Sequence, residues 1–292
     1  MSAVLVVRRG GLGDTLLMLP VLRALRRVHS GSVLHFAGVA EFASVLLEYG
    51  AVDRVLSSED LALWSLREPG TPAWERLRGY ALIASDDPVV MAVASADTKV
   101  QAFDPRPRTG APIALQVAGQ LGLEPDWPAD AALLPPRARL VDGPVCLAPG
   151  SGSRSKCWPR DRWLELAQRL AASGHRVQVV VGPVEQERDD PRSWPWSVEV
   201  AFVAEREATV LAHRLTGAAA FAGNDSGPSH LAAMLGVPTV AIFGPSAASV
   251  WAPPGPHATV VGGDGRELAA IRCDEVLHAL HAQGSRARTL RQ

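Results

Sequence analysis

The feature that most constrains this chain is the regular alternation of short apolar runs with stretches of helical spacing. Residues 3–7, with the sequence AVLVV, form a continuous apolar run of strand length. Such runs are typical of strands that are covered on both faces in a parallel sheet. A glycine-containing loop and an apolar helical stretch follow, and this order of strand, loop and helix recurs along the chain. Strands that alternate with helices predict an α/β fold with doubly wound sheets.

The pattern assigns elements to both halves of the chain. We expect one continuous first helix from Leu16 to Leu25, with Pro20 near its first turns. One or two surface helices are expected within residues 57–79, which hold Trp64 and Trp74. Further strands are predicted at residues 32–37, 52–56, 80–84, 98–103, 145–148, 176–181, 198–203, 218–222, 238–243 and 258–261. Further helices are predicted at residues 40–49, 111–121, 163–170, 208–215, 231–235 and 267–281.

A proline-rich stretch at residues 124–144 divides the chain, whose 292 residues suit two domains with a core each. This composition is typical of an interdomain linker, in which Leu133 and Leu134 could form a brief strand. We therefore predict two Rossmann-like doubly wound domains, residues 1–140 and 141–292, that face a central cleft. Packing of the last helix back on the first domain is left open. Open sheets bind ligands at the carboxyl ends of their strands, where the glycine loops of this chain lie.

The composition narrows the class of protein. A hydrophobic fraction of 47% and a formal net charge of -1 describe a soluble globular protein, and the lack of a basic excess argues against nucleic acid as a partner. Neither a signal peptide nor an apolar run of membrane-spanning length is expected. Three widely spaced cysteines argue against a disulfide framework. The cytosol is therefore the expected compartment.

The loop RRGGLGD at residues 8–14 ends in a carboxylate. Its glycine spacing does not match the dinucleotide-binding fingerprint. Asp14 is the candidate functional group, because a carboxylate beside an acceptor hydroxyl can act as a general base. The alternative is a plain helix N-cap, for which Asp is also favoured.

The loop PGSGSRSKCWP at residues 149–159 joins a predicted strand to a helix with small residues, hydroxyls and two cations. This chemistry suits a diphosphate, although the ending of a Walker A loop is absent. Lys156 stands out because the chain has only one other lysine, Lys99. A solvated loop is the alternative, and Trp158 is expected to pack rather than stack on a base. Glu185 follows a predicted strand, where acidic residues often accept ribose hydroxyls, but a solvated charge is nearly as plausible.

The stretch GNDSGPSH at residues 223–230 follows a predicted strand and opens a short helix. Free N–H groups at a helix start bind anions, so we interpret this turn as a phosphate cradle. The alternative is an ordinary turn that Asp225 caps. His230 lies about one helical turn after Ser226 and could face the same anion, although a buried structural histidine is the commoner case. The histidines show no metal-ligand spacing, and no metal or other cofactor is expected.

Together these motifs resemble the ADP-heptose:lipopolysaccharide heptosyltransferases, glycosyltransferase family nine, whose members have the two-domain GT-B architecture. The resemblance covers nearly the whole chain. It includes Pro20 after the first loop, and the segments GVPT at residues 236–239 and FGP at residues 243–245 after the last motif. Each motif is weak alone, whereas their order and spacing are fairly specific.

The resemblance implies an inverting, metal-independent transfer of a sugar, heptose in the family, from a nucleotide-diphosphate donor such as ADP-heptose. The acceptor would be a hydroxyl of a glycolipid or saccharide of the lipopolysaccharide-core type, with transient contact to the inner membrane possible. Asp14 matches the catalytic base and Lys156 the group that neutralises the leaving diphosphate. The other implied site residues are Ser151, Arg154, Glu185, Asp225, Ser226, Gly227 and His230 on the donor side, and Arg8, Arg9, Gly10, Gly11 and Gly13 in the acceptor-side loop.

Two features depart from the family. The chain is somewhat short, and its first domain lacks a strong basic cluster beyond Arg8, Arg9, Arg23, Arg26 and Arg27. An acceptor with many phosphates would be expected to meet more cations. Two other functions stay open, namely a sugar-nucleotide epimerase of the same architecture and a noncatalytic nucleotide-sugar-binding protein.

Overall fold

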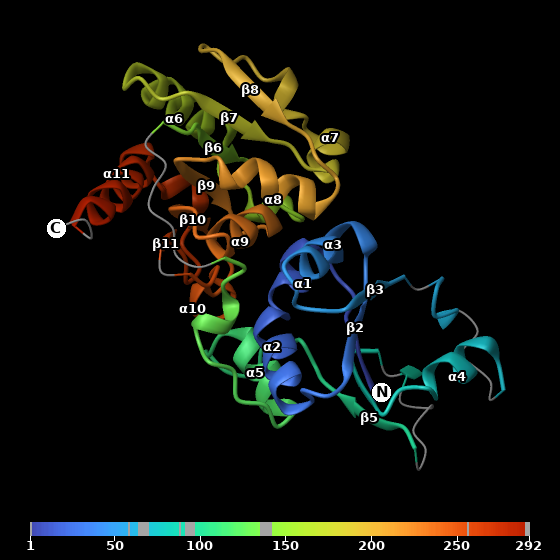
Figure 1. Ribbon diagram of the computed structural model, residues 1–292. Coiled ribbons are helices and arrows are strands. Elements are labelled where there is room, and N and C mark those ends of the chain that lie inside the picture. Colours follow the sequence, from blue (N-terminus) through green and yellow to red (C-terminus); the bar gives the residue numbers. More distant parts are fainter. Residues whose placement is uncertain are drawn as a thin grey trace. The chain divides into compact units, whose positions relative to one another are not determined.

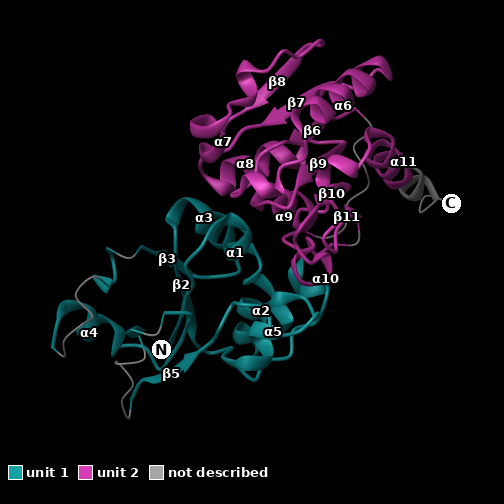
Figure 2. Cartoon of the chain, turned by 180° about the vertical axis from the view of Figure 1, so that it is seen from behind, with its two compact units in different colours: residues 1–131 teal, residues 132–292 magenta. Residues whose placement is uncertain are grey.

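The computed structural model describes residues 2–57, 59–63, 70–87, 89–90, 97–134, 142–255 and 257–289. The chain divides into two compact units, Met1–Ala131 (unit 1) and Ala132–Gln292 (unit 2), which are coloured separately in Figure 2. The boundary expected after residue 140 falls outside the described residues and stays a prediction.

Unit 1 contains a five-stranded sheet in the order β3-β2-β1-β4-β5, and all its pairings are parallel (Figure 1). Its strands are β1 (Ala3–Val7), β2 (Val33–Ala37), β3 (Arg54–Leu56), β4 (Leu82–Ser85) and β5 (Lys99–Ala102). Its helices are α1 (Leu12–Leu16), α2 (Leu19–Val28), α3 (Ala40–Glu48), α4 (Pro72–Leu77), α5 (Ile113–Gln120) and the 3-10 turn η3 (Ala129–Ala131).

Unit 2 contains a six-stranded sheet in the order β11-β10-β9-β6-β7-β8, again with parallel pairings. Its strands are β6 (Val145–Ala148), β7 (Val177–Val180), β8 (Val200–Val203), β9 (Ala220–Asn224), β10 (Thr239–Phe243) and β11 (Ala258–Gly262). Its helices are α6 (Arg160–Ala172), α7 (Pro183–Arg188), α8 (Ala208–Thr216), α9 (Gly227–Met234), α10 (Ala248–Trp251) and α11 (Cys273–Thr289), with 3-10 turns η4 (Arg154–Lys156), η5 (Pro191–Ser193) and η6 (Leu268–Ala270).

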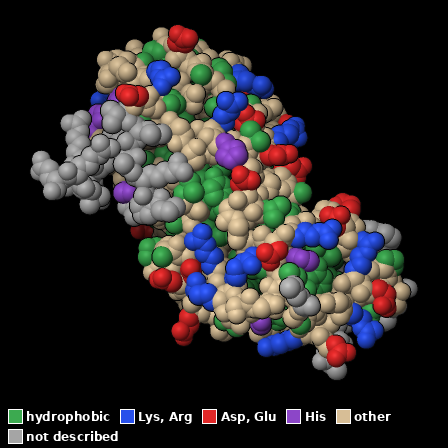
Figure 3. Space-filling view, viewed as in Figure 1, with side chains coloured by type: hydrophobic (Ala, Val, Ile, Leu, Met, Phe, Trp, Pro, Cys, Tyr) green, Lys and Arg blue, Asp and Glu red, His purple; other side chains and the backbone are tan. Residues whose placement is uncertain are grey.

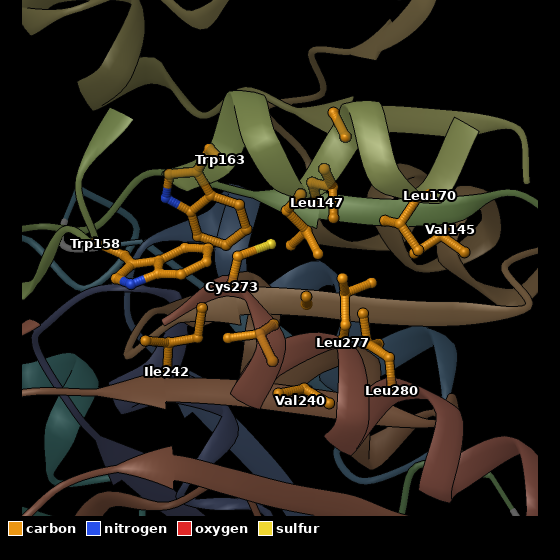
Figure 4. Packing of buried hydrophobic residues seen from close by; sticks show 14 of the residues in the cluster. Val145, Leu147, Trp158, Trp163, Leu170, Val240, Ile242, Cys273, Leu277 and Leu280 are labelled. Carbon is orange, nitrogen blue, oxygen red and sulfur yellow. The ribbon is translucent and has the colours of Figure 1, made fainter. Parts of the chain in front are cut away.

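Every second residue of the central strands of unit 2 points into one hydrophobic cluster on one face of the sheet. Leu147 of β6 and Ile242 of β10 share this face with the inner sides of α6 and α11, as Figure 4 shows. Trp158 and Trp163 meet edge to face, with ring centroids 5.1 Å apart, and both are almost fully buried. The Nε1 of Trp158 donates to the carbonyl oxygen of Ile271 (3.0 Å). The prediction that Trp158 packs in the core is therefore confirmed.

In both units strands alternate with helices in the predicted order, and helices cover the sheets. The α/β class with two doubly wound sheets is therefore confirmed. The order of strands reverses between β1 and β4 in unit 1, and between β6 and β9 in unit 2. Loops that leave neighbouring strands at such a switch point diverge and form a crevice at the carboxyl ends, where open α/β sheets bind ligands.

Three local predictions are wrong. The first helix is split into α1 and α2, because Pro20 lies in the first turn of a new helix, where its missing N–H costs nothing. Leu133 and Leu134 form no strand, and their N–H groups donate to the carbonyl oxygen of Met234 instead.

Within the stretch predicted as the linker, Asp130 is buried, and Arg27 of α2 binds both of its carboxylate oxygens. The closing helix begins at Cys273, after η6, and packs on α6, β9, β10 and β11 of its own unit.

In residues 57–79, α4 contains Trp74, whereas Trp64 lies outside the described residues. No helix among the described residues is both long and apolar enough to cross a membrane.

Candidate functional site

The loop after β1 carries the acceptor-side candidates of unit 1. Gly11 precedes α1 as its N-cap, and Asp14 lies in the first turn of this helix. The Oδ2 atom of Asp14 accepts a hydrogen bond from the N–H of Gly11 (3.0 Å), yet the side chain is still 36% exposed. Gly10 has a φ of +136°, and a Cβ atom there would lie 2.5 Å from the same Oδ2. Asp14 is therefore not the N-cap of the alternative interpretation but the third residue of the helix, whose carboxylate closes the helix start while facing solvent, and this is compatible with the role of a base.

Arg8 is held between two carboxylates. Its guanidinium contacts Oδ1 of Asp14 at 2.5 Å and Oδ2 of Asp86 at 2.7 Å. Asp86 follows β4, the neighbour of β1 at the switch point, and also accepts the N–H of Arg9 (3.3 Å). Arg9 forms an ion pair with the buried Asp87. These charge-assisted contacts fix both arginines and orient Asp14.

In unit 2 the loop after β6 is fixed by one buried side chain of β9. The Oδ1 of Asn224 accepts the N–H of Trp158 (3.0 Å), and its Nδ2 donates to the carbonyl oxygen of Pro149 (2.6 Å). Asn224 is fully buried. The amide thus ties both ends of the loop to the switch point between β6 and β9.

The anchored loop brings Lys156 to the turn after β9. Its Nζ lies 2.8 Å from Oδ2 of Asp225, whose side chain is 8% exposed. The hydroxyl of Ser151 donates to the carbonyl oxygen of Asp225 (2.8 Å). The Oγ of Ser226, the N-cap of α9, is buried and has no hydrogen-bond partner among the described residues. A cation, an orphaned hydroxyl and a helix N-terminus suit an anionic group of a ligand.

A cavity of about 460 Å³ lies at the carboxyl ends of β6 and β7, and Ser151, which lines it, connects it to this turn. Ser151, Arg154 and Glu185 line it, together with Arg188 and Trp194. Unlike the turn expected from sequence, Glu185 lies in the first turn of the short helix α7. Burial raises the pKa of the Glu185 carboxyl, although hydrogen bonds from its own N–H and that of Gly182 act in the opposite direction. The partly desolvated carboxylate is therefore not the solvated charge of the alternative interpretation.

Two glycines make room for this carboxylate. A Cβ atom at Gly150 would overlap the Cγ, Cδ and Oε1 atoms of Glu185, and one at Gly182 would overlap its Oε2. The guanidinium of Arg188 donates to the carbonyl oxygen of Gly152 (3.0 Å), which joins α7 to the loop after β6. The backbone at Gly150 and Gly182, after β6 and β7, thus encloses the Glu185 carboxylate, and we call this position the carboxylate seat.

Aromatic and basic side chains form the far wall of the cavity. The guanidinium of Arg160 lies 5.2 Å from the ring centroid of Trp194, within the range of a cation–π contact. The Nε1 of Trp194 donates to Oδ1 of Asp189 (3.0 Å). This wall offers an apolar surface and fixed charges beside the carboxylate seat.

The structure gathers the candidates into three groups. Arg8, Arg9, Gly10, Gly11, Gly13 and Asp14 lie in one loop and helix turn of unit 1. Lys156 pairs with Asp225 at the start of α9, next to Ser226 and Gly227, while Ser151, Arg154 and Glu185 line the cavity. His230 is buried within α9. Their roles stay predictions.

Sequence reasoning missed several residues of these groups. Asp86 and Asp87 are two consecutive carboxylates directly after a predicted strand, which is a usable signal. Asn224 was part of the quoted motif but was not predicted to organise the loop. Arg188 and Trp194 gave no signal, because their approach to the cavity depends on how α7 and η5 fold. Among the described residues, no three His, Cys, Asp or Glu side chains gather in a way that could hold a metal ion.

Comparisons with known proteins agree with this arrangement. The model of glycosyltransferase family 9 (heptosyltransferase) matches residues 119–279. Lipopolysaccharide heptosyltransferase 1 of Pseudomonas aeruginosa is 33% identical over 129 residues, which are 44% of this chain and only 34% of that relative. The aligned part thus spans about a third of that protein.

Two solved structures share the fold. That of a family 9 glycosyl transferase from Veillonella parvula has a TM-score of 0.77 and 18% identity, and the match covers 97% of each chain. That of the E. coli heptosyltransferase WaaC with ADP has a TM-score of 0.72 and 21% identity, and covers 96% of this chain and 99% of that one. Since the family model matches more than half of the sequence, this chain belongs to glycosyltransferase family 9, the heptosyltransferase family.

Proposed function

We propose that this protein transfers a heptosyl group from ADP-heptose to a hydroxyl of a saccharide or glycolipid acceptor of the lipopolysaccharide-core type. The transfer inverts the anomeric centre and needs no metal ion or other cofactor. Membership of the heptosyltransferase family and the ADP bound to the similar E. coli enzyme support the donor. The protein would act in the cytoplasm, in contact with the inner membrane where its acceptor is a glycolipid.

The observation that carries the proposal is the cavity of unit 2 with its seated Glu185 carboxylate, next to the pair of Lys156 and Asp225. A carboxylate at a strand end accepts the hydroxyls of a ribose. Lys156, the Ser226 hydroxyl and the N-terminus of α9 would hold the diphosphate. Arg154 adds a further positive charge on the cavity wall.

The reaction would use these groups as follows. The acceptor oxygen attacks the anomeric carbon of the donor and passes its proton to the carboxylate of Asp14. The bond from the anomeric carbon to the diphosphate oxygen breaks, and the leaving diphosphate takes the electron pair. Lys156 and the helix N-terminus stabilise the charge that develops on the diphosphate. Because attack comes from the face opposite the leaving group, the configuration inverts.

Arg8 would act as a positioning residue in this reaction. It holds one oxygen of Asp14, while the N–H of Gly11 holds the other, so the carboxylate keeps one orientation. Asp86 compensates part of the charge of Arg8 from the opposite side.

A donor panel tests the proposal. Thermal unfolding is followed with ADP-heptose, UDP- and GDP-sugars in EDTA, and ADP release is then measured with acceptor. A ligand at 100 times its Kd adds about 2.7 kcal/mol to the folded state, which corresponds to a rise in Tm of roughly 5–10 °C. Selective stabilisation by ADP-heptose and transfer in EDTA are expected.

Three results would contradict the proposal. If no nucleotide sugar raises the Tm, the proposed donor site is refuted. Formation of an epimeric nucleotide sugar without acceptor indicates an epimerase. Binding of ADP-heptose without turnover for any acceptor, by a protein whose Asp14→Asn variant behaves identically, indicates a noncatalytic binding protein.

A further inference from the structure

A second cavity, of about 560 Å³, lies wholly within unit 1 at the carboxyl ends of β1, β2 and β3. It is lined by Arg9, Gly10, Gly38, Glu41, Ser57 and Glu59, among others. Its volume is in the range of small-molecule sites, and its position at the strand ends is the usual one for ligands of an open α/β sheet. Gly10 connects the cavity to the loop that carries Asp14.

The cavity wall offers neutral hydrogen-bonding groups. Gly38 lets this wall pack closely, because a Cβ atom there would lie 2.8 Å from the ring of Phe36 and 3.0 Å from the carbonyl oxygen of Arg8, and its N–H donates to the carbonyl oxygen of Leu56. The hydroxyl of Ser57 can both donate and accept a hydrogen bond. Such groups recognise sugar hydroxyls without requiring charge on the ligand.

The arginines near this cavity are already engaged by carboxylates of the same unit. Arg8 contacts Asp14 and Asp86, and Arg9 pairs with Asp87. Two arginines of α2 also form ion pairs, Arg26 with Asp53 and Arg27 with Asp130. A phosphate of the acceptor would therefore have to displace an internal carboxylate from each arginine that it engaged.

Among the described residues that line the cavity, the remaining charge is negative. Glu41 and Glu59 are both exposed, and neither forms an ion pair with a described residue. Beyond Glu59, Arg76 donates to the carbonyl oxygen of Asp60, whose carboxylate offsets its charge. Residues 1–131 contain 12 basic and 15 acidic side chains, and Figure 3 shows both signs interspersed on the visible face of this unit. Such a wall repels an anion and is indifferent to a neutral sugar.

We propose that the acceptor hydroxyl belongs to an uncharged sugar residue that occupies this cavity, and that a phosphate or carboxylate on that residue weakens its use. The proposal rests on the proposed glycosyl transfer and names the class of its acceptor. It accounts for a family 9 chain in which Arg8 and Arg9, the arginines of the acceptor-side loop, are paired with carboxylates of the same unit.

The test uses matched pairs of acceptors with ADP-heptose as donor. The methyl glycosides of glucose, galactose, mannose and heptose are each supplied as the neutral sugar and as its monophosphate, and ADP release gives kcat/KM. Two exposed like-charge contacts of about 0.2–1 kcal/mol each predict a preference of roughly 2- to 30-fold for the neutral member at low salt. Added salt screens the repulsion, so the preference should shrink between 20 and 300 mM NaCl.

Variants test whether the charge of the cavity causes the preference for neutral acceptors. The double variant Glu41→Gln/Glu59→Gln should bring the preference close to 1 by improving use of the phosphorylated sugars. Glu48→Gln serves as the control, because Glu48 lies on the same helix α3 but not on the cavity wall. Equal or better use of the phosphorylated members at low salt, or a KM for them that rises with salt, overturns the proposal.

The same experiment distinguishes this proposal from the glycosyl transfer itself. If ADP-heptose raises Tm but no sugar of the panel accepts, the neutral-sugar site is refuted and the donor site stands. If ADP-heptose neither binds nor turns over, the glycosyl transfer fails first.

Discussion

Substituting Gly150 by Ala tests the carboxylate seat of unit 2. The new Cβ atom would overlap Cγ, Cδ and Oε1 of Glu185. Since Glu185 is a flexible side chain on the short helix α7, we expect it to rotate away instead of forcing the backbone apart. Donor binding would then lose Glu185, while the fold stays intact.

The substitution should affect folding stability less than donor affinity. Keeping the carboxylate in place would cost about 1–3 kcal/mol of overpacking. Rotation avoids most of this cost, because the desolvated carboxyl, whose pKa is raised by burial, regains water outside its seat. The free energy of unfolding should therefore fall by no more than about 1 kcal/mol. The lost charge-assisted hydrogen bond to the donor is worth about 1.5–3 kcal/mol, which corresponds to a Kd roughly 10- to 150-fold higher.

Calorimetry with ADP-heptose and urea unfolding measure both quantities. Gly152→Ala is the matched control, because a Cβ atom at Gly152 meets nothing within 4 Å. In the background of Glu185→Ala the obstacle is gone, so Gly150→Ala should add little to the loss of affinity. Additive losses in this double-mutant cycle, or parental affinity in Gly150→Ala, would refute the reasoning.

Three further perturbations follow from the same site. Lys156→Met should lower kcat by about 10²–10³ and stability by about 1 kcal/mol, because the partly exposed pair with Asp225 is lost; an unchanged kcat excludes Lys156 from leaving-group stabilisation. The raised pKa of Glu185 means that its contribution to stability is fully present below its ordinary pKa and is lost as pH rises through the raised value. The side chain of the Glu185→Gln variant does not titrate, so the Tm of the variant relative to that of the parent should increase from about pH 4 upward. A difference in Tm that stays constant with pH would contradict this expectation. Asn224→Ala leaves the Trp158 N–H and a carbonyl unpaired and should cost about 2–4 kcal/mol in urea unfolding, whereas a loss below about 1 kcal/mol would show that the loop is held otherwise.

The strands and the two sheets could be predicted because continuous apolar runs and glycine loops are local signals. The runs at residues 3–7 and 145–148 coincide with β1 and β6. The break between α1 and α2 was missed because the apolar spacing continues across it, although Pro20 in the first turn of α2 marks the new start.

The contacts within the site were less accessible from sequence. Arg8 and Asp86 are 78 residues apart, and only the pairing of β1 with β4 brings them together. The sequence pattern also does not say which polar group of a motif turns inward. Asn224 points to the loop after β6 and organises it, whereas Asp225 beside it meets Lys156. Long-range pairing of this kind depends on strand order, which local spacing leaves open.

The most direct test of the central claim is the rate of transfer by the Asp14→Asn variant with ADP-heptose and an accepted sugar, in EDTA. The asparagine has nearly the same shape, and Arg8 keeps its contact with Asp86, so donor affinity and Tm should stay close to those of the parent. We expect a kcat lower by about 10²–10⁴, the usual contribution of a general base, and an inverted anomeric configuration in the product of the parent. Transfer by Asp14→Asn at the parental rate, with donor affinity unchanged, would contradict the assignment of Asp14 as the base.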